Sequence, residues 1–462
     1  MTVTPLGRVS RHREVAALLA ADFVWDAADR VDAALALEPT RGGRTRRYPM
    51  VCALIWDSLV QIFGSSRQVE VELACPESGW WRTIRDAASA RGIEVPADPM
   101  RRFHYEWLRN TYLQSEVGLA VINDAFRELA AIDAAMIGLC DPHGVGSLTH
   151  PSPNRVVVGD GKVITPRFKT SPRKRVKLNK RTGELRTVQA DPDARLHVTG
   201  GGDRVFGTKF VLLSTRGDQR NQRILLDVAY SRSNEAADAL IALERTLPLL
   251  PGCQAVAYDG AFRGVHLRPL LKHHGVLPVS RLHSAQHGQV PDRHFGIVKV
   301  RNGNAAEIDV HLVNGAPCHR TFTVDGDPIV TPLPRLKTER RGRADGGFVL
   351  YNVYEVPAQL GGGTVRLRLD QTDEDVANGF NREEHLRAIP PDDPDHASIY
   401  GRRNDTESGN RLLDDSMLRE RAHTVGWRRQ LLNVMCWAAV RNAVAVWQHC
   451  PECVGLDPPL AA

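Results

Sequence analysis

The sequence lacks the features of several large protein classes. None of its apolar runs reaches the roughly 18 uninterrupted residues that a membrane-spanning helix needs, so we expect no membrane span. The start of the chain, MTVTPLGRVSRHRE, is polar and basic and contains no apolar core of a signal peptide, which predicts a cytoplasmic protein. Only eight cysteines occur in 462 residues. This is too few for a disulfide framework, so we expect reduced thiols.

Positive charge is concentrated in one short segment. The whole chain carries 60 Lys and Arg against 54 Asp and Glu, a net charge of +6. Residues 167–186 alone hold nine bases and one acid, which leaves the remainder slightly acidic. Such a run is either a solvated loop or a phosphate-binding surface. Its Pro, Lys and Gly content predicts a loop that is mobile when nothing is bound.

Residues 1–150 are predicted to form an all-α domain. Apolar residues recur at helical spacing over residues 15–37 and 48–63. Residues 65–92 are typical of a short helix, a Pro-containing turn and a second helix with Ser78 at its N-cap. This pattern is compatible with a helix-turn-helix that reads DNA, although two helices and a turn occur in most all-α domains.

The pattern changes to mixed α/β after a turn-rich segment at residues 149–154. Three strand-like runs, a helix, a strand, a helix and a final strand follow in that order, which predicts a mixed sheet with at least one crossover. Residues 286–395 alternate short β runs with Gly and Pro turns, which predicts a β-rich insertion. Residues 396–462 indicate one or two long helices, and we assign them with residues 151–285 to one domain.

Two aspartates, Asp160 and Asp259, follow apolar strand-like runs, and each precedes a glycine. A carboxylate at the end of a strand is held rigidly, and Mg²⁺ prefers such hard oxygen ligands together with water and phosphate oxygens. Asp-Gly turns at strand ends are also common in proteins without a metal. A third carboxylate in a suitable place therefore decides between the two interpretations.

The third carboxylate is Glu407. On one helix, offsets of 0, 3, 7 and 14 bring four side chains to one face: Tyr400, Arg403, Glu407 and Asp414. Arg411 adjoins the same face, four residues beyond Glu407. An aromatic ring, a carboxylate and arginines make poor core material. A solvated charged face would explain the charges but not the tyrosine in line with them.

The spacing of Tyr400, Arg403 and Glu407 resembles the Y-x2-R-x3-E-x6-K signature of a large clan of bacterial insertion-sequence DDE transposases. Asp160 and Asp259 look like the first and second catalytic aspartates of this clan. The order of strand–Asp, crossover, strand–Asp, β-rich insertion and Glu-bearing helix is similar to that of the clan's catalytic domain. The resemblance implies an α/β fold: an RNase H-like mixed sheet with a β-rich insertion, preceded by an all-α N-terminal domain.

The chain departs from the clan at two points. The last letter of the signature is Lys, whereas this chain has Asp414, so either Arg411 supplies the positive charge or that phosphate contact is absent. Residues 286–395 contain no tryptophan, which clan members that cut through a DNA hairpin use to hold a flipped base. Either the pathway differs, or another aromatic ring stacks on the base: Phe295, Tyr351 or Tyr354.

The resemblance implies Mg²⁺-dependent cleavage of DNA strands and transfer of an element end to target DNA, with Mn²⁺ able to substitute. Asp160, Asp259 and Glu407 would be both the catalytic and the metal-binding residues. The partner would be the double-stranded DNA of element ends and target, bound by a homodimer, with no nucleotide and no membrane. Seven further side chains would contact DNA: Tyr400, Arg403, Arg411, Arg173, Lys174, Arg175 and Lys177.

Two other functional classes share these residues. A decayed or domesticated transposase would bind DNA as a regulator without catalysis, but it should have lost a catalytic carboxylate, and all three candidates are present. A metal-dependent nuclease of the same fold would cut DNA without joining it, and it would need the same three carboxylates.

Other metal and nucleotide motifs are weak. Six histidines lie within residues 266–294, but their spacing matches no zinc template. The C-x2-C of Cys450 and Cys453 has no second pair at finger or ribbon spacing. The Gly-rich segments GDGK and GGGD match no P-loop, so we expect no nucleotide.

Overall fold

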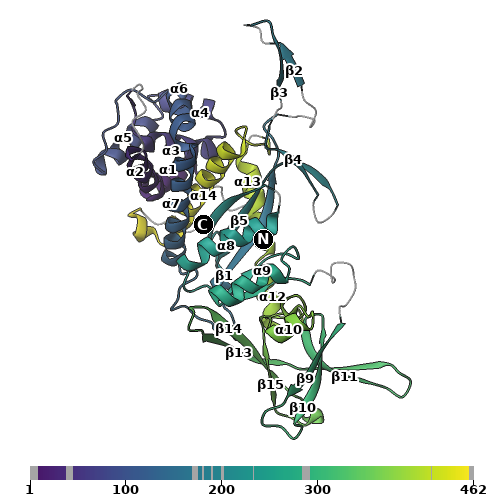
Figure 1. Ribbon diagram of the computed structural model, residues 1–462. Coiled ribbons are helices and arrows are strands. Elements are labelled where there is room, and N and C mark those ends of the chain that lie inside the picture. Colours follow the sequence, from purple (N-terminus) through teal and green to yellow (C-terminus); the bar gives the residue numbers. More distant parts are fainter. Residues whose placement is uncertain are drawn as a thin grey trace, which may run out of the picture.

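The computed structural model describes residues 9–37, 45–168, 175–178, 182–188, 191–198, 202–232, 234–282, 292–417 and 419–456. N-terminal helices, a central mixed sheet and a set of antiparallel sheets follow one another along the molecule (Figure 1). The predicted mixed α/β class, with N-terminal helices and antiparallel β sheets, is confirmed at this level. Within these ranges, every helix is too short or too polar to cross a bilayer.

The N-terminal part is built around one fully buried helix. All residues of α3 (Met50–Phe63) are buried, because neighbouring helices and the C-terminal helix α14 (Trp427–His449) surround it. The core of this part also takes in Phe210 and Leu225 from the central sheet. The other helices are α1 (Arg11–Ala20), α2 (Phe23–Ala36), α4 (Ser66–Ala74), α5 (Trp80–Ala90), α6 (Arg102–Leu108) and α7 (Glu116–Met136).

Two expectations for these helices are wrong. The helix predicted over residues 15–37 is divided into α1 and α2, because Ala21 takes an extended backbone conformation. Ser78 is not the N-cap of α5; that position belongs to Gly79, at φ +68°. The Ser78 hydroxyl instead donates to the carbonyl oxygens of Glu72 and Cys75, at 2.6 and 2.8 Å, and so closes the end of α4.

The central sheet contains the predicted three strands, helix, strand, helix and strand, together with one short strand that was not predicted, β4, between the first and second of them. Its spatial order is β4-β5-β1-β7-β8, and β6 also pairs with β5. β1 is antiparallel to β5 and parallel to β7, which is parallel to β8. The elements are β1 (Val156–Ile164), β4 (Arg195–Val198), β5 (Arg204–Arg216), β6 (Arg223–Ser231), α8 (Glu235–Thr246), β7 (Ala255–Ala257), α9 (Gly264–Pro269) and β8 (Leu277–Val279).

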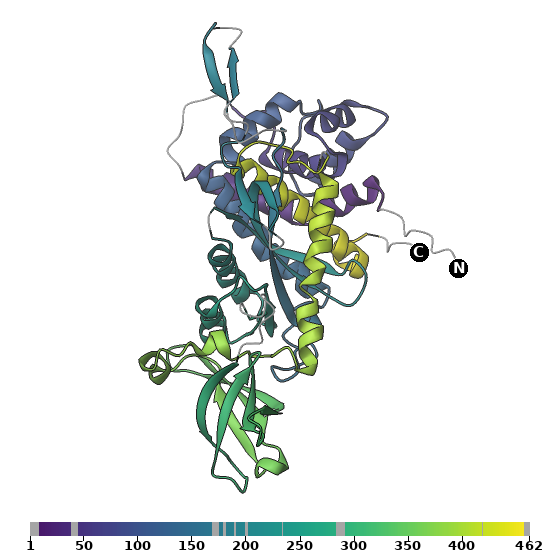
Figure 2. The same ribbon diagram turned by 90° about the vertical axis from the view of Figure 1, so that its right-hand side faces the viewer.

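The basic segment contains a hairpin rather than only a loop. β2 (Arg175–Leu178) and β3 (Leu185–Val188) pair antiparallel. Their ladder gives the backbone of this stretch its hydrogen bonds, so the expected loop is wrong here. The hairpin projects from the end of the molecule opposite to β9–β12 in both views (Figures 1 and 2).

The β-rich region forms two antiparallel sheets that pair separately from the central sheet in the described strands. The first has the order β12-β11-β10-β9 and the second β13-β14-β15. Leu350 and Tyr354 of the second sheet share a buried core with Val156 and Val158 of β1. The elements are β9 (Asp292–Lys299), β10 (Glu307–Val313), β11 (Ala316–Phe322), β12 (Pro328–Pro332), β13 (Arg335–Gly342), β14 (Phe348–Glu355), β15 (Thr364–Arg368), α10 (Asp373–Ala377) and α11 (Arg382–His385).

The C-terminal region is three helices rather than one or two: α12 (Pro394–Gly401), α13 (Asn404–Ser416) and α14. Arg402 and Arg403, between α12 and α13, keep helical backbone angles, so the spacing expected for one helix largely carries over. Cys450 and Cys453 form a disulfide across a 3₁₀ turn that brings their Cα atoms to 5.4 Å. The expectation of reduced thiols is therefore wrong for this pair.

Candidate active site

Two parallel strands bring Asp160 and Asp259 side by side. The last pair of the β1–β7 ladder joins Val158 to Ala257, so each aspartate lies two residues beyond it on its own chain segment. Adjacent strands lie about 4.8 Å apart, so the two carboxylates lie close together at the same edge of the sheet, just beyond the end of β7. Asp160 does not end its strand, as we expected from the sequence, because β5 continues to pair with β1 as far as Ile164.

Arg403 faces both aspartates. Its Nη2 atom lies 3.8 Å from Asp160 Oδ1 and 4.0 Å from Asp259 Oδ2. The side chain is about one quarter exposed, and its buried Nε–H has no hydrogen-bond partner among the described residues. A guanidinium offers five donors in a fixed fork, so Arg403 keeps donor capacity for a further anion.

The first turns of α13 fix the second oxygen of Asp160. Asn410 Nδ2 donates to Asp160 Oδ2 at 2.8 Å, and the Thr406 hydroxyl lies 3.3 Å from the same atom. Arg403, Thr406 and Asn410 share one face of the helix, since they are three and seven residues apart. The face of α13 that carries Arg403 of the predicted pattern is therefore the face that covers Asp160.

A further carboxylate that we did not predict, Glu235, lies at the first turn of α8. Its Oε1 accepts a hydrogen bond from the Tyr258 hydroxyl at 3.0 Å, and its carboxylate pairs with Lys209. A Cβ atom on Gly161 would lie 2.3 Å from the Glu235 carboxyl carbon, and one on Gly159 would lie 2.6 Å from the Tyr258 ring. The sequence signal for this arrangement was the pair of glycines on either side of Asp160. Glycine within a strand often marks a place where another group approaches the backbone closely.

Burial raises the pKa of both aspartates. For Asp160 the Arg403 charge opposes this rise, while the charges of Glu235 and Asp259 add to it. For Asp259 the hydrogen bond from the Ala261 amide opposes the rise, and Glu235 again adds to it. The three carboxylates of Asp160, Asp259 and Glu235 face two cations, Arg403 and Lys209, which leaves an excess of one negative charge when all three are ionised. A divalent cation would relieve this excess, because the carboxylates offer the hard oxygen ligands that Mg²⁺ prefers.

Glu407 lies one turn of α13 beyond Arg403 and is exposed. Among the described residues, the groups of three or more His, Cys, Asp or Glu whose ligand atoms all lie within 4.8 Å of one another are at other places. The structure thus brings Asp160 and Asp259 together under Arg403 and leaves Glu407 on the adjoining helix surface. The residues present fit a metal at the two aspartates, with Glu407 as an exposed carboxylate on the covering helix.

The remaining predicted contact residues have different surroundings. Tyr400 is buried, with its ring stacked on His396 at 5.2 Å and the Arg281 guanidinium 5.3 Å away. Arg411 is exposed. The backbone of Arg175 and Lys177 belongs to β2, whereas Arg173 and Lys174 lie outside the described residues.

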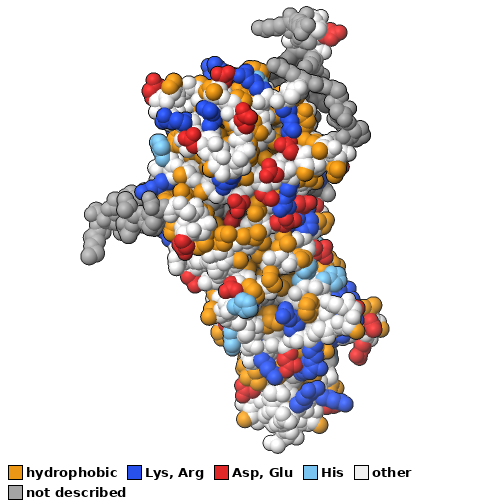
Figure 3. All heavy atoms as spheres, turned by 90° about the vertical axis from the view of Figure 1, so that its left-hand side faces the viewer, with side chains coloured by type: hydrophobic (Ala, Val, Ile, Leu, Met, Phe, Trp, Pro, Cys, Tyr) orange, Lys and Arg blue, Asp and Glu red, His pale blue; other side chains and the backbone are white. Residues whose placement is uncertain are grey.

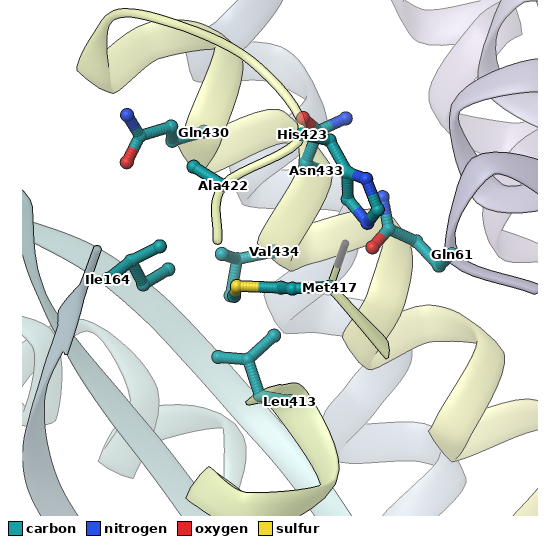
Figure 4. A pocket seen from close by; sticks show the side chains of 9 residues that line it. All are labelled: Gln61, Ile164, Leu413, Met417, Ala422, His423, Gln430, Asn433 and Val434. Atoms are coloured by element: carbon teal, nitrogen blue, oxygen red, sulfur yellow. The ribbon is translucent and has the colours of Figure 1, made fainter. Parts of the chain in front are cut away.

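A pocket at the junction of α3, β1, α13 and α14 offers no comparable chemistry (Figure 4). Burial lowers the pKa of His423 in this pocket to about 4, so the ring is neutral at pH 7. The pocket contains no carboxylate among its described lining residues: Gln61, Ile164, Leu413, Met417, Ala422, His423, Gln430, Asn433 and Val434.

Comparison with known proteins finds no family that matches this chain and no curated protein of significant similarity. The functional assignment therefore rests on the site itself. On the face shown in Figure 3, basic and acidic side chains of the described residues are interspersed over the N-terminal helices. DNA reading by α4 and α5 stays a prediction.

Proposed function

We propose that this protein is a DDE transposase that cleaves DNA strands and joins element ends to target DNA. The observation that carries the proposal is the position of Arg403. This residue of the Tyr400–Arg403–Glu407 pattern faces Asp160 and Asp259, which lie far from it in the sequence. A solvated charged helix would have no reason to direct its arginine at two partly buried carboxylates, because removing a carboxylate from water costs free energy.

An RNase H-like sheet is part of the proposal. The strands that carry it are, in spatial order, β6, β5, β1, β7 and β8. β5 is antiparallel to both of its neighbours, β6 and β1, whereas β7 and β8 run parallel to β1. Asp160 lies on the first strand and Asp259 follows the fourth in chain order. This arrangement supports the proposed fold, since it reproduces the succession of elements that the resemblance implies.

The protein's own residues would do the following in the reaction. Asp160, Asp259 and Glu407 would hold Mg²⁺, or Mn²⁺ in its place, and the bound metal would activate the attacking oxygen and stabilise the leaving oxygen. Asn410 would keep the Asp160 carboxylate in place through its hydrogen bond to Oδ2. Arg403 would bind a non-bridging phosphate oxygen beside the scissile bond, using donors that the described residues leave free.

Basic residues outside this centre would hold the DNA backbone. Arg173, Lys174, Arg175 and Lys177 belong to the basic segment of residues 167–186, and phosphate contacts by such residues give affinity without sequence readout. Arg411 adds one exposed positive charge on α13. The DNA would be duplex, at element ends and target, and two copies of the chain would hold the two ends.

A strand-transfer assay tests this function. Labelled duplexes with the sequences that flank the gene are incubated with Mg²⁺ and a target plasmid, and labelled plasmid is measured. Joined product supports the transposase. Cleavage without joining identifies a nuclease of the same fold, and binding without cleavage identifies a regulator.

A further inference from the structure

A cluster of two histidines and two aspartates lies on the β9–β12 sheet, apart from the aspartates of the candidate active site. His294 Nε2 lies 2.7 Å from Asp309 Oδ1, and His311 Nε2 lies 3.7 Å from Asp309 Oδ2. The rings of His294 and His311 are 4.9 Å apart between centroids. We propose that His294, His311 and Asp309 form a binding site for Zn²⁺.

The backbone places the two imidazoles side by side through a β-bulge. His311 on β10 pairs with His294 on β9, whereas the preceding pair is Val310 with Gly296. Phe295 is the extra residue, and without the bulge it would stand opposite His311. Gly296 has φ +125°, a backbone conformation that side chains other than glycine's disfavour. β-Bulges often reorient side chains at functional positions, and this bulge places His294 of β9 directly opposite His311 of β10.

The donor atoms are those that zinc takes. Zn²⁺ binds imidazole nitrogen and carboxylate oxygen at about 2.0–2.2 Å, so two ligand atoms of a tetrahedral site lie about 3.3 Å apart. The two nitrogen–oxygen distances in the cluster, 2.7 and 3.7 Å, lie on either side of that value. Three protein ligands leave one position for water, and His294 is 60% exposed, so a metal can enter from solvent.

The surroundings of His311 match those of a metal-bound histidine. Its Nδ1 atom is buried and has no hydrogen-bond partner among the described residues, and it faces Asp292 Oδ1 at 3.6 Å. With a metal on Nε2, Nδ1 must carry the proton and can donate it to Asp292. Asp292 is in turn paired with Arg320 at 2.6 Å. A carboxylate behind the ligating imidazole fixes its tautomer and orientation at many zinc sites.

A metal at this place would join an edge strand to the rest of its sheet. β9 pairs with β10 alone among the described strands, and most of its residues are exposed or half-buried. A metal that binds only the folded state raises the unfolding temperature, and the rise grows with the logarithm of the free metal concentration above Kd. Zinc should therefore stabilise the protein measurably.

The test is zinc binding to the full chain in excess Mg²⁺, in a C450S/C453S background that removes the other possible metal-binding group, Cys450, Glu452 and Cys453. H294N/H311N should retain about one equivalent of Zn²⁺ less than the parent after dialysis, and D309N should show the same reduction. H150N is the matched control, since His150 pairs with Asp395 at 3.0 Å without a second imidazole.

Two further measurements make the test decisive. Zn²⁺ should raise the unfolding temperature of the parent and of H150N but not of H294N/H311N, and Co²⁺ should give a visible absorption band with the same dependence. Far-UV circular dichroism confirms that each variant is folded. Equal zinc content in the parent and H294N/H311N overturns the proposal, as does an equal reduction in H150N.

Discussion

Lys162 on β1 and Asp414 on α13 form an ion pair, with 2.5 Å between Nζ and Oδ2. Position 414 is where the resembled signature has a lysine, so here the positive charge stands on the strand and the negative charge on the helix. Lys162 and Asp160 alternate with Gly161 on one face of β1, so the pair fixes α13 over the same face as Asp160.

The Lys162–Asp414 pair should contribute to stability through coupling rather than through either charge alone. Both side chains are at least two-thirds buried, so a double-mutant cycle with K162M and D414N should give a coupling free energy of about 1 kcal/mol. The charge-reversed K162D/D414K should be more stable than K162D alone. Urea unfolding measures each value, and a coupling indistinguishable from zero would contradict the pairing.

Removing the Asp160 charge should stabilise the protein when no divalent cation is present. Burial raises the folded-state pKa of Asp160 above its unfolded value, so its stabilising contribution is present at low pH and is lost as the pH rises through the folded pKa. D160N should therefore unfold with a higher free energy than the parent at pH 7.5 in EDTA, and the gain should shrink as the pH falls through the raised folded-state pKa of Asp160 toward the unfolded value of about 4.

The control for D160N is D218N, because Asp218 forms an exposed pair with Arg402. D218N should gain no stability at pH 7.5. Mg²⁺ should raise the unfolding temperature of the parent more than that of D160N. A D160N protein less stable than the parent at pH 7.5 in EDTA would show that Asp160 is a structural ion-pair partner.

Glu407 and Glu235 should differ in their effect on catalysis. Glu407 is exposed on the covering helix and free to bind a metal, so E407Q should abolish DNA cleavage and leave DNA affinity unchanged. Glu235 is already held by Lys209 and Tyr258, so E235Q should act by changing the electrostatic field at Asp160 and Asp259. It should lower the rate of DNA cleavage by about 10- to 100-fold. Full cleavage by E407Q and none by E235Q would reverse the two roles.

Neutralising the basic segment should weaken binding to all DNA sequences to the same extent. The variant R173A/K174A/R175A/K177A should lower the slope of log K against log salt by up to about 0.9 for each duplex phosphate that the protein no longer neutralises. Fluorescence anisotropy over a salt series measures the slope. The control replaces four basic residues of β13 and the turn after it: Lys337, Arg340, Arg341 and Arg343. An equal change in both variants would show that net charge alone matters.

The order of the central strands and helices was predictable because each element buries a continuous apolar run that its sequence displays. The proximity of Asp160 to Asp259 was predictable for the same reason, since each aspartate follows such an apolar run. Glu235 was missed because its place depends on the absence of side chains at Gly159 and Gly161. The His294–His311 pair was missed because a bulge, not sequence spacing, aligns them across two strands.

Two predictions of local structure, for Asp160 and for Ser78, were wrong for similar physical reasons. Asp160 was expected at a strand end because Gly161 follows it, but pairing with β5 extends β1 past the glycine. Ser78 was expected to be the N-cap of α5, but Gly79 takes that position, and the Ser78 hydroxyl donates to the end of the preceding helix while it accepts only a long hydrogen bond from the Trp80 amide. In both cases a partner distant from the local pattern decides the conformation, which propensity alone does not show.

The measurement that tests the central claim most directly is Mg²⁺-dependent cleavage of a supercoiled plasmid that carries the gene with its native flanking DNA. The parent protein and D218N should nick or linearise the plasmid, and D160N and D259N should bind it without cutting. Loss of cleavage in both variants with retained binding is the predicted result. Cleavage by D160N and D259N at the parent's rate would contradict the assignment of these two aspartates.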